Sequence, residues 1–153
     1  FCGSNDELKR YSKGINSVTI CSFPGNYTVI SQNYANLDII SHELCHTFLY
    51  NKIGFFNKTA LPTWFDEGVA MQLDYRDYYC DSLIEKSYKT DPVLLNKISS
   101  KKAFYYANKE TQRFNYIIAK CEVQNWIDKN GKNKFKRLIE SVKEGREFNE
   151  VYK

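Results

Sequence analysis

The sequence predicts an α+β fold, with a small N-terminal β-sheet followed by a mainly helical C-terminal half. Two segments with β-branched, strand-like alternation, 17–23 and 27–31, lie within the first 31 residues. From residue 36 onward, helical periodicity and helix-start signals dominate. The chain has 153 residues, of which 42% are hydrophobic and 16% aromatic, so it is long enough to bury a core.

Composition and charge argue against several classes of protein. No apolar run approaches the roughly 20 residues that a membrane-spanning helix needs, so we expect no membrane segment. The net charge of +4 comes from basic residues interspersed with acidic ones, and the lysines along 129–143 alternate with apolar helix positions. We therefore expect a solvated surface and no nucleic-acid partner. The five cysteines form no C-x-x-C pair. Four of them could make two disulfides in an exported protein, but we favour reduced thiols and the cytoplasm over secretion.

The N-terminal region is predicted to form a short helix and an antiparallel pair of strands. The helix begins after Ser4, a capping residue followed by acidic residues, and ends at Gly14. The strand over 17–23 is followed by a Pro-Gly-Asn turn signal at 24–26 and by the strand over 27–31. We expect this second strand to lie along a cleft and to offer its edge to an extended peptide.

The next predicted helix contains the sequence HELCH, with the only two histidines of the chain. It begins after a cap at Asn36 and ends at Gly54. His42, Glu43 and His46 are expected to face the cleft. The apolar positions form a stripe on the other side, which we expect to face the core: Leu37, Ile40, Leu44 and Phe48.

Further helices are predicted along the rest of the chain. One opens at Leu-Pro-Thr, 61–63, with proline near its first position. A short helix follows a cap at Asp91. A long helix over about 110–130 ends at Asn-Gly, and a last amphipathic helix over 135–142 precedes Gly145.

The HELCH sequence carries the groups of a metal-assisted hydrolase. Residues four apart lie on one face of a helix, so His42 and His46 can direct two imidazoles at one ion. Glu43 lies one step round the helix, where a carboxylate can act as a base on water. The spacing therefore predicts a metal site that holds one catalytic Zn²⁺.

A catalytic zinc site requires a third protein ligand, and no further histidine is available. Glu67 is the best candidate, because it lies about twenty residues after His46 on a second predicted helix. Gly68 permits a close approach of the two helices. Asp66 is the alternative ligand, and it is better placed as an acceptor that orients a histidine N–H.

The sequence HELCH followed by LPTWFDEG at 61–68 resembles the gluzincin metallopeptidases, which include thermolysin and the zinc aminopeptidases. The LP-x-W-x-x-EG form is similar to the small bacterial thermolysin-like domains of the peptidase MA group. The resemblance runs from about Tyr27 to Phe148 and implies a zincin-like α+β fold. The chain departs from the family at Asn130, where an aromatic residue is usual, and it lacks a thermolysin-type catalytic histidine.

The resemblance implies zinc-dependent hydrolysis of a peptide or protein substrate. Zinc on His42, His46 and Glu67 activates a water, and Glu43 acts as the general base. The negative charge that develops on the carbonyl oxygen needs a hydrogen-bond donor. Aminopeptidase-like gluzincins use a tyrosine, and the family pattern matches Tyr116 best, with Tyr106 and Tyr105 as competitors.

Two functions remain open from the sequence. We expect one metallopeptidase domain over 1–153, which can be a fragment of a longer chain because it begins at Phe1 and not at Met. The alternative is a catalytically inactive zincin-like module that binds or regulates a partner, with a structural zinc or none. The intact Glu43 favours the enzyme.

Overall fold

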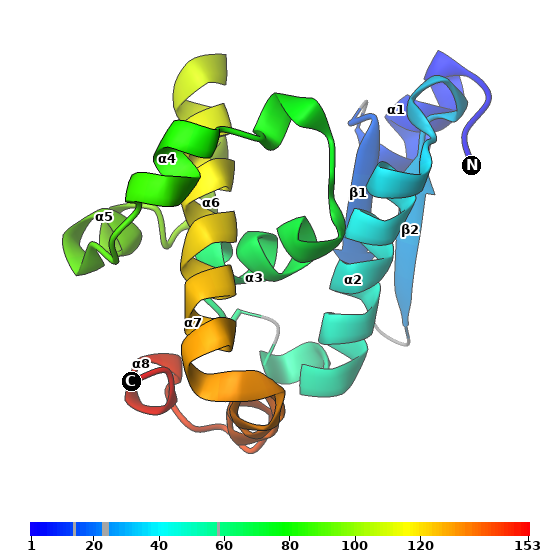
Figure 1. The fold of residues 1–153 in the computed structure, drawn as a ribbon. Coiled ribbons are helices and arrows are strands. Elements are labelled where there is room, and N and C mark those ends of the chain that lie inside the picture. The colour runs from blue at the N-terminus through cyan, green and yellow to red at the C-terminus, as the bar shows by residue number, and fades with distance from the viewer. Residues whose placement is uncertain (14, 23–24, 58) are drawn as a thin grey trace.

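The computed structural model describes residues 1–13, 15–22, 25–57 and 59–153. It confirms the α+β class: a two-stranded hairpin packs on helix α2, and the C-terminal half is mostly helical around the long helix α7 (Figure 1). In chain order the described elements are α1 (Asn5–Ser12), β1 (Ser17–Cys21), β2 (Asn26–Ile30), η1 (Gln32–Tyr34), α2 (Leu37–Ile53), η2 (Phe55–Asn57), α3 (Thr63–Ala70), η3 (Met71–Leu73), η4 (Asp77–Tyr79), α4 (Ser82–Ser87), α5 (Pro92–Lys97), α6 (Lys101–Tyr105), α7 (Lys109–Lys143) and α8 (Phe148–Val151).

The predicted helix and strand pair are present at the N-terminus. The Ser4 hydroxyl accepts a hydrogen bond from the Glu7 N–H at the start of α1, which confirms the predicted cap. β1 and β2 pair antiparallel. Three predicted features lie outside the described residues: the helix end at Gly14, the strand end at Phe23 and the turn at Pro24.

The two faces of the hairpin have different chemistry. On one face, Val18 and Val29 pack with Leu8 of α1. The other face carries Thr19 and Thr28, which lie opposite one another in the strand register. This threonine face lies against α2, which crosses the hairpin in Figure 1. The contact between the sheet and α2 is therefore partly polar.

Helix α2 has the predicted bounds but buries a different face. It is capped at Asn36 and is followed by Gly54, as predicted. The predicted core stripe is wrong, because Leu37, Leu44 and Phe48 are 78%, 55% and 65% exposed. The buried residues of α2 are Ile39, His42, Glu43, His46, Leu49 and Ile53.

The neighbours of α2 explain this difference. The hairpin and α3 both contact the histidine side of the helix, so that side is interior. Ile39, Leu49 and Ile53 supply its apolar contacts at helical spacing. Both stripes have the helical period, and tertiary packing selected the one that carries the histidines.

Helix α3 lies between α2 and α7 and contacts α7 most extensively (Figure 1). All eight of its residues are buried. A Cβ atom on Gly68 would lie 2.4 Å from the Ala119 carbonyl oxygen and 2.7 Å from Val123 Cγ2. Glycine therefore permits close packing, as predicted. The predicted partner was wrong, because the helix that approaches Gly68 is α7 and not the histidine helix α2.

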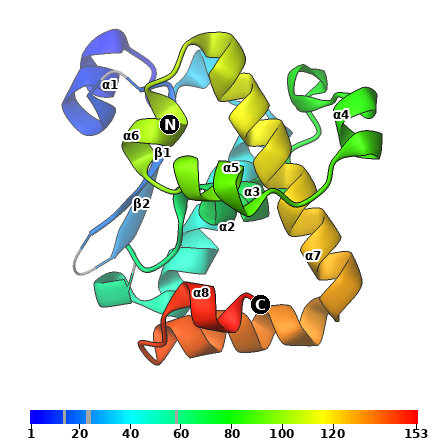
Figure 2. The same cartoon turned by 90° about the vertical axis from the view of Figure 1, so that its left-hand side faces the viewer.

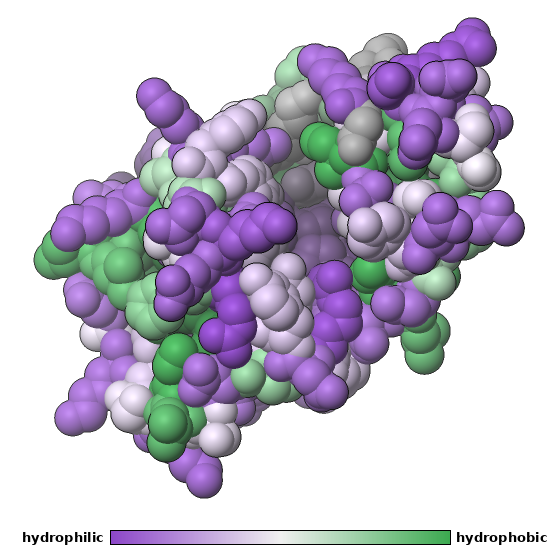
Figure 3. Space-filling model, turned by 90° about the horizontal axis from the view of Figure 1, so that it is seen from above, coloured by the Kyte–Doolittle hydropathy of each residue, from purple (hydrophilic) through white to green (hydrophobic). Residues whose placement is uncertain are grey.

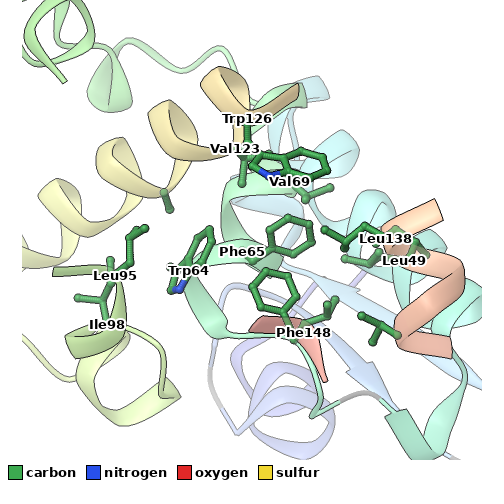
Figure 4. Packing of buried hydrophobic residues seen from close by; sticks show 14 of the residues in the cluster. Leu49, Trp64, Phe65, Val69, Leu95, Ile98, Val123, Trp126, Leu138 and Phe148 are labelled. Carbon is green, nitrogen blue, oxygen red and sulfur yellow. The ribbon is translucent and has the colours of Figure 1, made fainter. Parts of the chain in front are cut away.

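The main core surrounds α3 (Figure 4). The rings of Trp64 and Phe65 pack against Phe148 with centroid separations of 5.8 and 4.8 Å. Val123 and Trp126 of α7 close the same cluster. Aromatic packing on this scale fixes the position of α3, and with it the acidic residues that α3 carries.

Helix α7 bends at Gly131, where φ is 78° (Figure 2). The two helices predicted over 110–130 and 135–142 are present as the arms on either side of this bend. The second arm and α8 lie beneath α3 in the view of Figure 1. Within the described ranges, no helix combines the length and apolar character needed to cross a bilayer.

Candidate metal centre

Three buried side chains converge between α2 and α3. His42 and His46 lie one turn apart on α2, and Glu67 comes from α3. The three residues are 7%, 6% and 4% exposed, respectively. The two Nε2 atoms are 3.2 Å apart, His42 Nε2 lies 3.3 Å from Glu67 Oε2, and His46 Nε2 lies 3.7 Å from Glu67 Oε1. The triad could hold a metal ion.

The geometry fits a tetrahedral ion. Bonds of about 2.0–2.1 Å to nitrogen and oxygen place neighbouring ligand atoms of a tetrahedral site roughly 3.3 Å apart. The two separations from His42 Nε2, to His46 Nε2 and to Glu67 Oε2, are close to this value. Glu67 Oε2 is also buried without a hydrogen-bond partner among the described residues. A buried carboxylate oxygen in this state is costly, and a bound cation would satisfy it.

The position of His46 is fixed by two further residues. Its Nδ1 lies 2.9 Å from Asp66 Oδ1, the acceptor that the sequence predicted. The Tyr50 hydroxyl donates to Asp66 Oδ2 at 2.6 Å, and the Tyr50 ring stacks on the His46 ring. Asp66 therefore accepts a hydrogen bond from the His46 Nδ1–H, and Nε2 is left directed at the centre.

His42 has a carboxylate behind it that the sequence analysis missed. Asp74 is fully buried, and its Oδ2 lies 3.4 Å from His42 Nδ1. The Arg76 Nε–H donates to Asp74 Oδ1 and Oδ2 at 2.9 and 3.1 Å. Asp74 lies beyond α3, where a turn and not helical periodicity sets its position. The one local pattern that could have pointed to Asp74 is the Asp-x-Arg pair. It is typical of a turn in which the aspartate accepts from the backbone two residues on, and here the Arg76 backbone N–H donates to Asp74 Oδ1.

The centre is built to hold positive charge. Burial lowers the pKa of His42, but Asp74 and Glu67 outweigh it and raise that pKa above its usual value. Burial likewise lowers the pKa of His46, and Asp66 and Glu67 raise it well above the usual value. Burial raises the pKa of Glu67, yet the two histidines bring it well below normal. The carboxylates therefore favour a cation between them, either a proton or a metal ion.

Glu43 lies beside the triad in the same cleft. It is 5% exposed, and its Oε2 accepts a hydrogen bond from the Thr19 hydroxyl at 2.9 Å. The cleft has a volume of about 490 Å³ and is lined by the triad, Glu43, residues 17–19 of β1, and Arg76, Tyr79 and Tyr116. We had expected the second strand, β2, to lie along the cleft, but the strand that borders it is β1.

Figure 3 looks onto the molecule from above and shows a hollow between its two halves, bordered mainly by hydrophilic residues.

A second hollow is larger but holds none of this chemistry. Its volume is about 790 Å³, and residues of α5, α7 and the C-terminal segment line it. The triad and Glu43 are not part of its lining. The smaller cleft is therefore the candidate site, because it contains the converging ligands.

The three candidate tyrosines have different environments. The Tyr116 ring lies 6.4 Å from the His42 ring, and burial raises the pKa of its hydroxyl well above the usual value. The Tyr105 hydroxyl donates to Glu67 Oε1. Tyr106 is 84% exposed. Tyr105 thus holds the carboxylate of the triad, and Tyr116 lines the cleft next to a histidine.

Comparisons with protein-family models, with curated proteins and with solved structures find no match to this chain.

Proposed function

We propose that the protein is a zinc-dependent metallopeptidase. The observation that carries the proposal is the convergence of His42, His46 and Glu67 on one point in a cleft that also contains Glu43. Two imidazoles and one carboxylate as ligands, with a second carboxylate beside them, are the groups of a catalytic zinc site. The sequence resemblance to the gluzincins at 42–46 and 61–68 points to the same chemistry.

The triad would hold the ion through His42 Nε2, His46 Nε2 and Glu67 Oε2. When bound, zinc supplies a Lewis acid for the scissile carbonyl and lowers the pKa of water toward about 7. Asp66 orients the His46 imidazole from behind, and the Asp74 carboxylate faces His42 Nδ1 at 3.4 Å. The Tyr105 hydroxyl bonds Glu67 Oε1 and so directs Oε2 at the centre.

Glu43 is the proposed general base. Its carboxylate accepts the proton of the attacking water and passes it to the leaving amine. Its place in the cleft beside both histidines supports this role. Tyr116 is the proposed donor to the carbonyl oxygen as negative charge develops, because its ring neighbours His42 and it lines the cleft.

The substrate is proposed to be an extended peptide. β1 lines the cleft at 17–19 and pairs with β2 along its other edge. A strand edge that faces a cleft can hold a peptide by main-chain hydrogen bonds. The peptide would then pass Glu43 and the metal ligands in an extended conformation.

Incubation of the zinc-loaded protein with a diverse peptide mixture tests the proposal. We expect cleavage that a chelator abolishes. The Glu43→Gln variant should retain zinc but lose about 10²–10⁴-fold in kcat, because it removes the base. Glu140→Gln, at an exposed position on the second arm of α7, is the matched control and should cleave normally.

Two outcomes would contradict the enzyme. Full activity in Glu43→Gln would remove the proposed mechanism. Absence of cleavage in the zinc-loaded wild type would favour the alternative, an inactive zincin-like module that binds a partner.

A further inference from the structure

Hydroxyl groups, and not only apolar side chains, join the hairpin to α2. The Thr19 hydroxyl oxygen lies 2.9 Å from Glu43 Oε2 and 2.8 Å from the Glu43 carbonyl oxygen. It also lies 2.9 Å from the Thr28 hydroxyl, which in turn lies 2.9 Å from the Thr47 hydroxyl. Three threonines from β1, β2 and α2 therefore form a continuous chain that ends at the Glu43 carboxylate.

The protons of this chain can be assigned. Each hydroxyl donates one hydrogen bond and can accept two. The Glu43 carboxylate is a stronger acceptor than the Glu43 carbonyl, which also accepts within α2, so Thr19 donates to Oε2. Thr28 then donates to Thr19. Thr47 donates to Thr28 at 2.9 Å in preference to the Glu43 carbonyl oxygen, which lies further away at 3.3 Å. All three bonds point toward Oε2, and each one polarises the next.

Packing alone does not require these hydroxyls. On the opposite face of the hairpin, Val18 and Val29 make an apolar contact with α1. Valine has nearly the shape of threonine and would fill the same space on the α2 face. However, valine at position 19 would leave Glu43 Oε2 without its donor in a site where Glu43 is 5% exposed.

We propose that Thr19 is a positioning residue for Glu43. Its hydroxyl holds Oε2, which leaves Oε1 to meet the attacking water. A base must be held within about 0.5 Å of its productive position to act efficiently. This inference rests on the proposed function, in which Glu43 is the general base. It adds a residue of β1 to the machinery that α2 and α3 supply.

Kinetics of zinc-loaded variants test this role. Thr19→Val should lower kcat by about 10–100-fold, because a base displaced by up to about 1 Å loses on this scale, with KM changed less than about twofold. Thr19→Ser should restore kcat to within about threefold of the wild type. Thr28→Val should give a smaller loss, since it removes only a bond further along the chain. Thr19→Ala serves as a second variant if Thr19→Val does not fold.

Thr90→Val is the matched control. The Thr90 hydroxyl also donates to a buried glutamate, Glu122, at 2.8 Å, but it lies away from the cleft. Its loss should lower stability and leave kcat unchanged. Equal kcat in Thr19→Val and the wild type would overturn the inference, as would an equal loss in Thr90→Val. Zinc content, measured by elemental analysis, should remain the same in all these variants.

A structural comparison separates this inference from the proposed function. Crystal structures of the wild type and Thr19→Val should show the Glu43 carboxylate turned away from its wild-type orientation in the variant. This readout does not depend on cleavage. A carboxylate in the same position in both proteins would overturn the role of Thr19, even if the wild type proved to be an active peptidase. Reorientation in a protein without activity would leave the role of Thr19 intact and reject the peptidase.

Discussion

At the scale of residues, the two histidines of the centre are supported unequally. His46 Nδ1 lies 2.9 Å from Asp66, within hydrogen-bonding distance. His42 Nδ1 lies 3.4 Å from Asp74 and has no hydrogen-bond partner in the described part of the chain. Asp74 also forms an ion pair with Arg76, which competes for its charge. Asp66 should therefore contribute more to metal binding than Asp74.

Asp66→Asn tests this difference. The amide keeps an acceptor for His46 but loses the charge that makes the imidazole a better ligand, so we expect zinc affinity to fall by about 10–100-fold. Competition with a chromophoric chelator measures the affinity. Asp128→Asn, at an exposed position, is the control and should bind zinc as the wild type does. Unchanged affinity in Asp66→Asn would show that the hydrogen bond does not support the metal.

The triad could be predicted from the sequence because its geometry is mostly local. His42 and His46 are related by helical spacing, and Glu67 follows in a second recognisable motif. Asp74 could not be predicted in this way, since a turn sets its position. Thr19 was missed because its contact with Glu43 depends on how the hairpin packs on α2, which strand periodicity does not specify.

At the scale of elements, α2 shows where pattern reasoning fails. Its bounds follow from local capping at Asn36, and the structure confirms them. Two apolar stripes of α2 have the same helical period, so periodicity does not decide which one is buried. The buried stripe also carries the two histidines and Glu43, and these polar residues led to the wrong prediction that the other stripe faces the core. Leu44 and Phe48 are exposed, while two histidines and a glutamate of the same helix are buried. Burying such polar groups is costly unless they share a partner, so this orientation of α2 supports a buried centre.

Gly68→Ala tests the packing of α3 on α7. The added methyl group would meet the Ala119 carbonyl oxygen, a backbone atom that cannot rotate away. Overpacking costs about 1–3 kcal/mol, which exceeds the roughly 1 kcal/mol that alanine gains over glycine in helix propensity. We expect the free energy of unfolding, measured in urea, to fall by about 1–2 kcal/mol.

Gly25→Ala is the matched control for this packing test. A Cβ at Gly25 has no neighbour within 4 Å among the described atoms, so its stability should change little. A Gly68→Ala protein as stable as the wild type would mean that α3 and α7 can separate without loss. In that case the interface would not fix the position of Glu67.

At the scale of the whole molecule, the centre lies where separate parts of the chain meet. α2 supplies His42, His46 and Glu43, α3 supplies Glu67, and β1 and α7 border the cleft. The bend at Gly131 brings the second arm of α7 and α8 back against α3. The fold class followed from the order of strand and helix signals along the chain. At the bend, the sequence predicted only the end of a helix at Asn-Gly, because local sequence does not specify the direction in which the next helix runs.

The central claim is that His42, His46 and Glu67 hold one zinc ion. An anomalous difference map at the zinc edge, from crystals of the zinc-loaded protein, tests it most directly. The account predicts a single strong peak about 2.0–2.2 Å from His42 Nε2, His46 Nε2 and Glu67 Oε2. A map with no peak between these atoms, or with zinc held by other residues, would contradict it.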